Sequence, residues 1–305
     1  MLEHPPFYNQ KITVEPVDSF LFNGHTYSFH VARFDRIDPL LSGNKLYKLK
    51  YQLLQMQQEE KKGILTMGGA YSNHLAATAF LCRQYQIPCT AIIRGEERIP
   101  LSHTLSACRN NGMQLLFTER SAFQSESNTV IRIQQEFPDY LFVPAGGDNE
   151  AGEAGAAEMP LAVDNWESYD SIICAVGTGT TLRGIFRKLQ PHQNLYGIVA
   201  LRIPETQQTL FKESSFKKDS PSKPNYYFGA AGKGFGKQEE TLLELMNTFF
   251  QQTKIPTDFV YTAKALKGLL DLYDQKLIGV QNRILLMHTG GLQGNNSLLK
   301  GRLTF

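Results

Sequence analysis

Short apolar runs alternate with helical patterns through most of the chain. A run of apolar residues from Ile64 to Met67 is followed by a glycine pair and by helical spacing from about Ser72 to Gln84. The same pattern continues with a second helix near Ser102 to Asn110. We expect further strands at Cys89–Ile93, Met113–Phe117, Tyr140–Val143, Ser171–Val176, Leu195–Leu201 and Arg283–His288. Alternation of this kind predicts an α/β fold with parallel sheets and helices on both faces.

Four polar or glycine-rich loops follow predicted strands, and ligands in such folds bind where strands end and helices begin. These loops are Gly68–Asn73, Gly146–Asn149, Gly177–Thr181 and His288–Gly291. The polar stretch Phe211–Asn225 is expected to form a long surface loop or flap. Gly232–Lys237 lacks the spacing of a nucleotide-binding loop and is expected to form a flap on the substrate side.

The loop Gly177-Thr178-Gly179-Thr180-Thr181 has the composition of a phosphate cradle. Small residues let backbone N–H groups converge, a following helix would add its positive end, and the threonine hydroxyls can donate. The Gly-Lys-Ser/Thr ending of a Walker loop is missing, and the glycine spacing does not fit a dinucleotide site. A tight turn without a ligand is the alternative.

Two lysines stand at the start of a predicted helix, in Gly43-Asn44-Lys45-Leu46-Tyr47-Lys48. Lys45 and Lys48 lie on one face of the first turn, where positive charge opposes the helix dipole. This indicates a bound anion or a required amine, with two solvated lysines as the alternative. In Gly68–His74, Ser72 and Asn73 either cap the following helix or donate to a ligand. His74 alone is more typical of a helix histidine with its own partners.

Composition narrows the class of protein. The chain has 305 residues, which suits two α/β lobes or one large one, and a formal net charge of +2. This charge gives no support for nucleic-acid binding. The four cysteines form no C-x-x-C pair, and the first residues lack the apolar run of a signal peptide. No apolar stretch is long enough to span a membrane, so we expect a cytoplasmic protein.

The motifs occur together in a recognisable order. Asn-Lys-x-x-Lys-Leu, Gly-Gly-x-x-Ser-Asn, Gly-Gly-x-Asn, the Gly/Thr loop and His-Thr-Gly-Gly extend over about Arg33 to Gln293. This order resembles the family of 1-aminocyclopropane-1-carboxylate deaminase and D-cysteine desulfhydrase. Members are enzymes that use pyridoxal 5'-phosphate (PLP) and have the fold of the tryptophan synthase β subunit (fold type II).

The resemblance implies a role for each matching residue. Lys45 matches the lysine that holds PLP as a Schiff base, and Lys48 one that helps to hold its phosphate. Ser72 matches the serine beside the substrate, and Asn73 the asparagine bonded to the cofactor's ring hydroxyl. The phosphate loop corresponds to Gly177, Thr178, Gly179, Thr180 and Thr181.

Three further residues match the region of the pyridine ring. Tyr261 matches an active-site tyrosine. Thr262 stands where the cyclopropane deaminases carry a glutamate that faces the pyridine nitrogen, and Thr289 lies in a segment that reaches the same nitrogen in the desulfhydrases. No residue of the chain is predicted to bind a metal.

The resemblance also implies two lobes, with the cofactor between them. We expect a smaller α/β domain at residues 51–151, inserted into a larger PLP-binding domain formed by residues 1–50 and 152–305. A homodimer is implied by the resemblance alone.

The expected activity is deaminating elimination from a small amino acid. A neutral threonine cannot stabilise a protonated pyridine nitrogen as a carboxylate does, which favours elimination of a good β-leaving group, as from D-cysteine. Ring-opening deamination is the alternative, and racemisation or dehydration on the same scaffold also stays open. A PLP- or nucleotide-binding regulator without catalytic activity is the candidate from another class.

Overall fold

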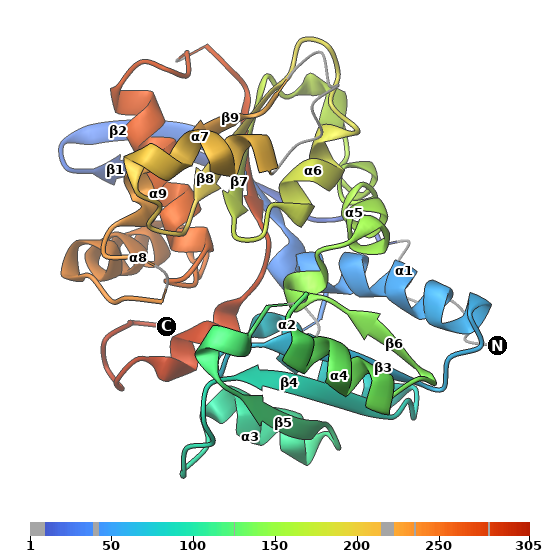
Figure 1. Ribbon diagram of the computed structural model, residues 1–305. Helices are drawn as coiled ribbons and strands as arrows, with labels where there is room; N and C mark the ends of the chain where they lie inside the picture. Colours follow the sequence, from blue (N-terminus) through green and yellow to red (C-terminus); the bar gives the residue numbers. More distant parts are fainter. Residues whose placement is uncertain (1–9, 39–42, 125, 215–222, 235, 280) are drawn as a thin grey trace.

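The computed structural model describes residues 10–38, 43–124, 126–214, 223–234, 236–279 and 281–305. They fold into two lobes, each built on its own sheet (Figure 1). The smaller sheet has four parallel strands in the order β5-β4-β3-β6. Its strands are β3 (Gly63–Gly68), β4 (Cys89–Arg94), β5 (Gln114–Thr118) and β6 (Tyr140–Val143).

The larger sheet has six strands in the order β1-β2-β10-β7-β8-β9. Its strands are β1 (Val14–Phe22), β2 (His25–Arg33), β7 (Ser171–Val176), β8 (Asn194–Val199), β9 (Asn225–Tyr227) and β10 (Ile284–His288). All neighbours are parallel except β1 and β2. That antiparallel hairpin turns at Asn23 and Gly24, whose φ angles are 50° and 79°. The turn suits an Asn-Gly pair because both positions need positive φ.

Helices cover both faces of each sheet, which confirms the predicted α/β class. In the larger lobe, α8 and α9 lie on one side of the sheet and α5 and α6 on the other (Figure 1). The helices are α1 (Asn44–Gln58), α2 (Asn73–Gln84), α3 (His103–Asn110), α4 (Asn128–Glu136), α5 (Glu150–Ala156), α6 (Thr180–Phe186), α7 (Glu205–Ser214), α8 (Glu240–Thr253) and α9 (Thr262–Asp274). No helix in these ranges is both long enough and apolar enough to cross a membrane.

Helix α1 connects the lobes. Its apolar residues recur every three or four positions, and Leu46, Leu49, Leu53 and Met56 join the buried core of the smaller lobe. The helix therefore crosses residue 51, where the smaller domain is expected to begin. The two sheets agree with a division into a smaller and a larger lobe, and the boundary itself stays a prediction.

The segment expected as a long loop is partly regular. Residues 211–214 form the end of α7, and Asn225 begins β9, so the prediction of a loop over Phe211–Asn225 was wrong at both ends. Tyr226 and Phe228 explain the strand end, because they pack against the core of the larger lobe. Residues 215–222 lie outside the described part.

Candidate active site

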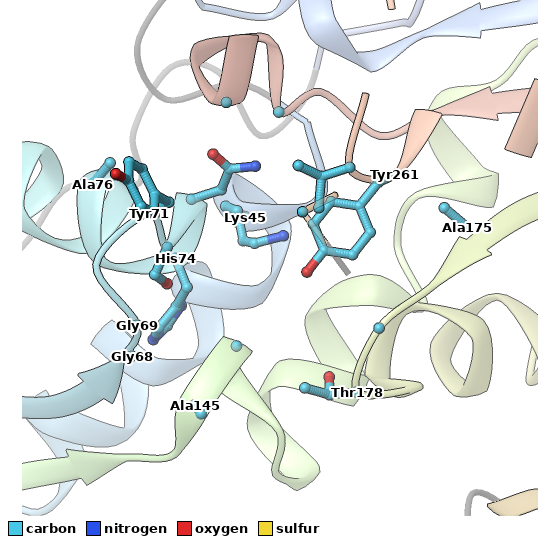
Figure 2. Close-up of a pocket in the computed structure, with 18 of the residues that line it drawn as sticks. Lys45, Gly68, Gly69, Tyr71, His74, Ala76, Ala145, Ala175, Thr178 and Tyr261 are labelled. Atoms are coloured by element: carbon cyan, nitrogen blue, oxygen red, sulfur yellow. The ribbon is translucent and has the colours of Figure 1, made fainter. Parts of the chain in front are cut away.

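A cavity of about 770 Å³ is lined by segments from both lobes. Its walls include the loops after β3, β6, β7 and β10 together with the first turns of α1 and α2. Carboxyl ends of parallel strands meet at one edge of a sheet, so these loops converge as the sequence predicts. Figure 2 shows Lys45 between Tyr261 on one side and Tyr71 and His74 on the other.

Lys45 lies in the first turn of α1 and reaches into this cavity. Its Nζ donates to Asn44 Oδ1 at 2.7 Å, and Asn44 Nδ2 donates to Thr181 Oγ1 at 2.6 Å. Burial lowers the pKa of Lys45 to about 8, against an opposing effect of the Asp258 carboxylate. The neutral form, which attacks a carbonyl or takes a proton, is therefore present in roughly a tenth of the molecules at pH 7, far more than for an ordinary lysine.

Lys48 is one turn further along α1 and is 3% exposed. Its Nζ donates to Gly146 O at 3.0 Å. Burial and the neighbouring Lys45 hold the pKa of Lys48 well below its ordinary value. An anion beside this amine would reverse that effect, so the side chain suits a phosphate better than it suits an empty pocket.

The Gly/Thr loop connects β7 to α6 and brings several donors to the cavity. Thr181 Oγ1 accepts from Asn44, so its hydroxyl proton remains available to the cavity. Thr180 behaves differently, because its hydroxyl donates to Asp148 Oδ1 at 2.7 Å and also contacts Thr178 Oγ1 at 2.8 Å. Asp148 also accepts from Arg183. Thr180 thus anchors the loop to Asp148 and does not itself line the cavity.

Ser72 and Asn73 stand at the start of α2 and line the cavity. Ser72 caps the helix, because its Oγ accepts from the N–H of Leu75 at 3.3 Å, and the hydroxyl proton remains for a ligand. Asn73 Oδ1 accepts from Gln293 Nε2 at 2.6 Å. This contact leaves the Asn73 Nδ2 group as the donor that faces a ligand.

His74 is buried and neutral. Thr66 Oγ1 donates to Val143 O at 2.8 Å and therefore accepts from His74 Nε2, 2.9 Å away. His74 Nδ1 is then an acceptor, and it has no hydrogen-bond partner in the described structure. Burial and the charges of Lys45 and Lys48 lower the pKa of His74 to about 3. The ring cannot serve as an acid at neutral pH, and its Nδ1 can accept from a ligand or from water.

Tyr261 and Thr289 complete the wall opposite α2. Burial raises the pKa of Tyr261, so the phenol keeps its proton. Thr262, the next residue, is turned away from the cavity. Its hydroxyl donates to Asp258 Oδ1 at 2.7 Å and accepts from the Asp258 N–H, also at 2.7 Å. Its only proton is therefore engaged, and these contacts do not support the expectation that Thr262 faces the pyridine nitrogen.

The structure thus brings together most of the residues predicted from the sequence. Those that line the cavity are Lys45, Lys48, Ser72, Asn73, Gly177, Thr178, Gly179, Thr181, Tyr261 and Thr289. Thr180 and Thr262 do not line it. Gln293, Arg94 and Arg120 line it without having been predicted. The two arginines follow the predicted strands Cys89–Ile93 and Met113–Phe117, so the rule on strand ends could have found them.

These donors fit PLP. Lys45 offers an amine, Lys48 and the Gly177–Thr181 loop offer partners for a phosphate, and Asn73 offers an amide N–H for a ring oxygen. The space also depends on glycine, because a Cβ at Gly177 would lie 3.1 Å from the Tyr261 ring. A cofactor bound here would have Lys45, Tyr261 and Thr289 around it.

Comparison with known proteins leads to the same chemistry. Residues 33–290 match the profile of a family described as pyridoxal-phosphate dependent enzyme. A Thermotoga maritima protein provisionally named 1-aminocyclopropane-1-carboxylate deaminase is 24% identical over 287 residues, which cover 88% of this chain and 90% of that protein.

Two solved structures show the same fold. One, described as an ACC deaminase homologue, superposes with a TM-score of 0.76 at 21% identity over 95% of this chain and 92% of the other. A hydrogen sulfide-producing enzyme from Fusobacterium nucleatum superposes with a TM-score of 0.63 at 15% identity, over 92% and 93%. The predicted resemblance and the fold type are confirmed.

Proposed function

Because the chain belongs to the family of pyridoxal-phosphate-dependent enzymes, we propose that it is a deaminating lyase acting on a small amino acid by β-elimination. The reaction resembles that of a D-cysteine desulfhydrase: cysteine and water give pyruvate, hydrogen sulfide and ammonia. Bound PLP supplies the electron sink for the carbanion that such a reaction requires.

The observation that carries this proposal is the chemistry of the cavity wall. Within the described ranges, no aspartate or glutamate lines the cavity. The nearby Asp258 has both carboxylate oxygens engaged: Oδ2 accepts from the N–H groups of Val260 and Tyr261, and Oδ1 from the N–H and hydroxyl of Thr262. A neutral partner such as Thr289 is then what remains for the ring nitrogen. That environment gives a weaker sink, which elimination tolerates because the leaving group carries charge away.

The chain's own groups can be given steps in this reaction. Lys45 Nζ would take the α-proton of the substrate, and its lowered pKa leaves part of the amine neutral and able to act as a base near neutral pH. Ser72 and the first N–H groups of α2 bind the substrate carboxylate. Tyr261 stays protonated because burial raises its pKa, and it donates toward the departing group.

Ring-opening deamination of 1-aminocyclopropane-1-carboxylate is the second candidate. The names of the Thermotoga relative and of the solved deaminase homologue favour it. The hydrogen sulfide-producing structure favours elimination instead. All three share less than 25% identity with this chain, so the wall of the cavity carries more weight than their names.

The test is a substrate panel on the PLP-loaded protein. D- and L-cysteine, β-chloroalanine of both hands and the cyclopropane substrate are compared for release of keto acid, ammonia and sulfide. We expect the highest kcat/KM with a β-substituted amino acid. Faster turnover of the cyclopropane substrate would establish ring opening in its place, and no turnover of any amino acid would favour a non-catalytic PLP-binding regulator.

We further propose a homodimer, on the resemblance alone, and a cytoplasmic location. The four cysteines are free and buried, which suits a reducing compartment. Light scattering and cell fractionation test the two statements separately.

A further inference from the structure

The charged side chains that line the cavity have one sign. Within the part of the chain that the structure describes, they are Lys45, Lys48, Arg94, Arg120 and Lys237. Lys45 and Lys48 serve the cofactor in the proposed function. Arg94 ends β4 and Arg120 follows β5, both have exposed side chains, and neither holds the cofactor in the proposed function. The proposed function therefore gives no partner to the positive charges of these two arginines.

Strand pairing brings the backbone at Arg94 next to the segment that carries Arg120. Gly68, the last residue of β3, is the partner of Ile93, so Arg94 follows at the edge of the sheet where the loop that carries Ser72 begins. On its other side Arg94 pairs with Thr118, and Arg120 follows two residues later. A Cβ built at Gly95 would lie 3.5 Å from Arg120 Nε, which shows that this guanidinium folds back toward Arg94's strand.

Two neighbouring guanidinium groups repel one another unless an anion lies between them. In the described structure neither arginine forms an ion pair or a side-chain hydrogen bond, whereas Arg109 nearby pairs with Glu97 at 2.8 Å. Arginine suits this position because its planar fork can bind a carboxylate, sulfonate or phosphate through two parallel hydrogen bonds.

In the proposed function, the α-carboxylate of the substrate already has another place. It binds at Ser72 and the first N–H groups of α2, which lie on the cavity wall next to Asn73. Arg94 ends β4, the neighbour of β3, whose following loop carries Ser72, so the two residues come from adjacent strands. An anion bound there belongs to the side chain of the substrate.

We propose that Arg94 and Arg120 bind a second anionic group of the substrate, so that the enzyme prefers amino acids whose β-substituent is a sulfonate or a phosphate ester, which leaves as sulfite or phosphate in the elimination. Aspartate, whose β-carboxylate cannot leave, binds at the same place without reacting. This inference rests on the proposed function and names its substrate class. Both arginines are exposed, so their effect is sensitive to ionic strength.

The test measures binding by the change in cofactor absorbance, independently of turnover. Aspartate and cysteate are titrated against their neutral counterparts asparagine and serine, in both hands, at low and high salt. We expect the anionic ligands to bind at least about tenfold more tightly, with the advantage falling as salt rises. Equal binding of aspartate and asparagine, with keto acid still released from neutral amino acids, would overturn this inference and leave the proposed function intact.

Variants locate the effect. Arg94→Gln and Arg120→Gln should each remove most of the preference for anionic ligands and leave binding of serine unchanged. Arg98→Gln is the matched control, because Arg98 is exposed on the same segment without lining the cavity. An equal loss in Arg98→Gln, or weaker binding of PLP itself in the Arg94 and Arg120 variants, would overturn the assignment. If no amino acid alters the absorbance and none yields keto acid, both the inference and the proposed function fail.

Discussion

Gln293 fixes the orientation of Asn73. The two side chains are 220 positions apart in the chain, and Gln293 Nε2 lies 2.6 Å from Asn73 Oδ1. The backbone of Gln293 is itself held, because its main-chain carbonyl oxygen lies 3.1 Å from His103 Nε2. Since the glutamine amide donates, the asparagine presents its own N–H group to the cavity, where a ring hydroxylate of the cofactor would need a donor.

Gln293→Leu should therefore alter the cofactor without unfolding the protein. Loss of the donor lets the Asn73 amide rotate, so its hydrogen bond to the ring oxygen weakens and PLP binds about three- to tenfold less tightly. A shift in the absorbance band of the bound cofactor is expected, because ionisation of the ring hydroxyl changes. A purely structural role would instead lower the melting temperature and leave the band of the remaining bound cofactor in place.

Lys45 and Lys48 should separate covalent attachment from phosphate binding. Borohydride reduction of the PLP-loaded protein is expected to label Lys45, which peptide mapping detects. Lys45→Ala should abolish the label. Lys48→Gln should keep the label on Lys45 but weaken PLP binding at least about tenfold, because a charged partner of the phosphate is lost. A label on any other lysine in the unaltered protein contradicts this assignment.

Gly43 is required where the start of α1 meets the loop after β10. Its φ is +71°, and a Cβ there would lie 1.9 Å from Thr289 O. Gly43→Ala should lower the free energy of unfolding by about 2–5 kcal/mol, from left-handed strain and a backbone clash together. It should also weaken PLP binding, since Lys45 and Thr289 are displaced.

Gly24→Ala is the matched control for that substitution. Gly24 also has positive φ, at +79°, but a Cβ there meets nothing within 4 Å. We expect a cost of about 1–2 kcal/mol in denaturant unfolding and no change in PLP affinity. Equal effects of the two substitutions on PLP affinity would show that the contact with Thr289 does not matter.

The pH dependence of turnover should follow Lys45. Burial lowers the pKa of this amine to about 8, so it is protonated below that pH and neutral above it. Only the neutral amine takes a proton, and kcat should fall about tenfold per pH unit on the acid side of 8 and level off above it. His74 should not contribute, because its pKa is lowered to about 3. A kcat that does not change between about pH 6.5 and about pH 9, a range that spans the Lys45 pKa, would contradict the role of Lys45 as the base.

The sequence predicts those parts of the fold whose signals are local. Apolar runs of four to six residues with a glycine-rich loop behind them mark β3, β6 and β7, and the carboxyl-end rule then gathers their loops. The hairpin of β1 and β2 was not predicted. In β1 the register shifts between Val17 and Phe20 and breaks the alternation of apolar and polar positions, although β2 keeps the alternation at Tyr27, Phe29 and Val31. The Asn23-Gly24 pair was the signal that could have found it.

Side-chain direction is the part of the site that the sequence does not predict. Thr262 and Tyr261 are adjacent, yet the Asp258 turn at the start of α9 takes the hydroxyl of Thr262 and leaves Tyr261 in the cavity. Gln293 depends on a contact with a residue in another lobe, which no local pattern encodes.

The pyridine nitrogen is the remaining point at which one residue should change the reaction. Thr289 lines the cavity and is 8% exposed. Thr262, in contrast, has its hydroxyl bound to Asp258. Thr289→Asp would place a carboxylate where a neutral hydroxyl stands, which keeps the nitrogen protonated and deepens the electron sink. We expect the ratio of cyclopropane ring opening to β-elimination to rise at least about tenfold, which corresponds to a differential effect of about 1.4 kcal/mol on the two barriers. Ring opening gains more, because it must break a carbon–carbon bond without a departing anion to carry charge away.

Thr262→Val serves as the control, since it removes the contact with Asp258 without adding charge to the cavity, and it should leave the ratio unchanged. If Thr262→Val shifts the ratio and Thr289→Asp does not, the partner of the nitrogen lies on α9 after all.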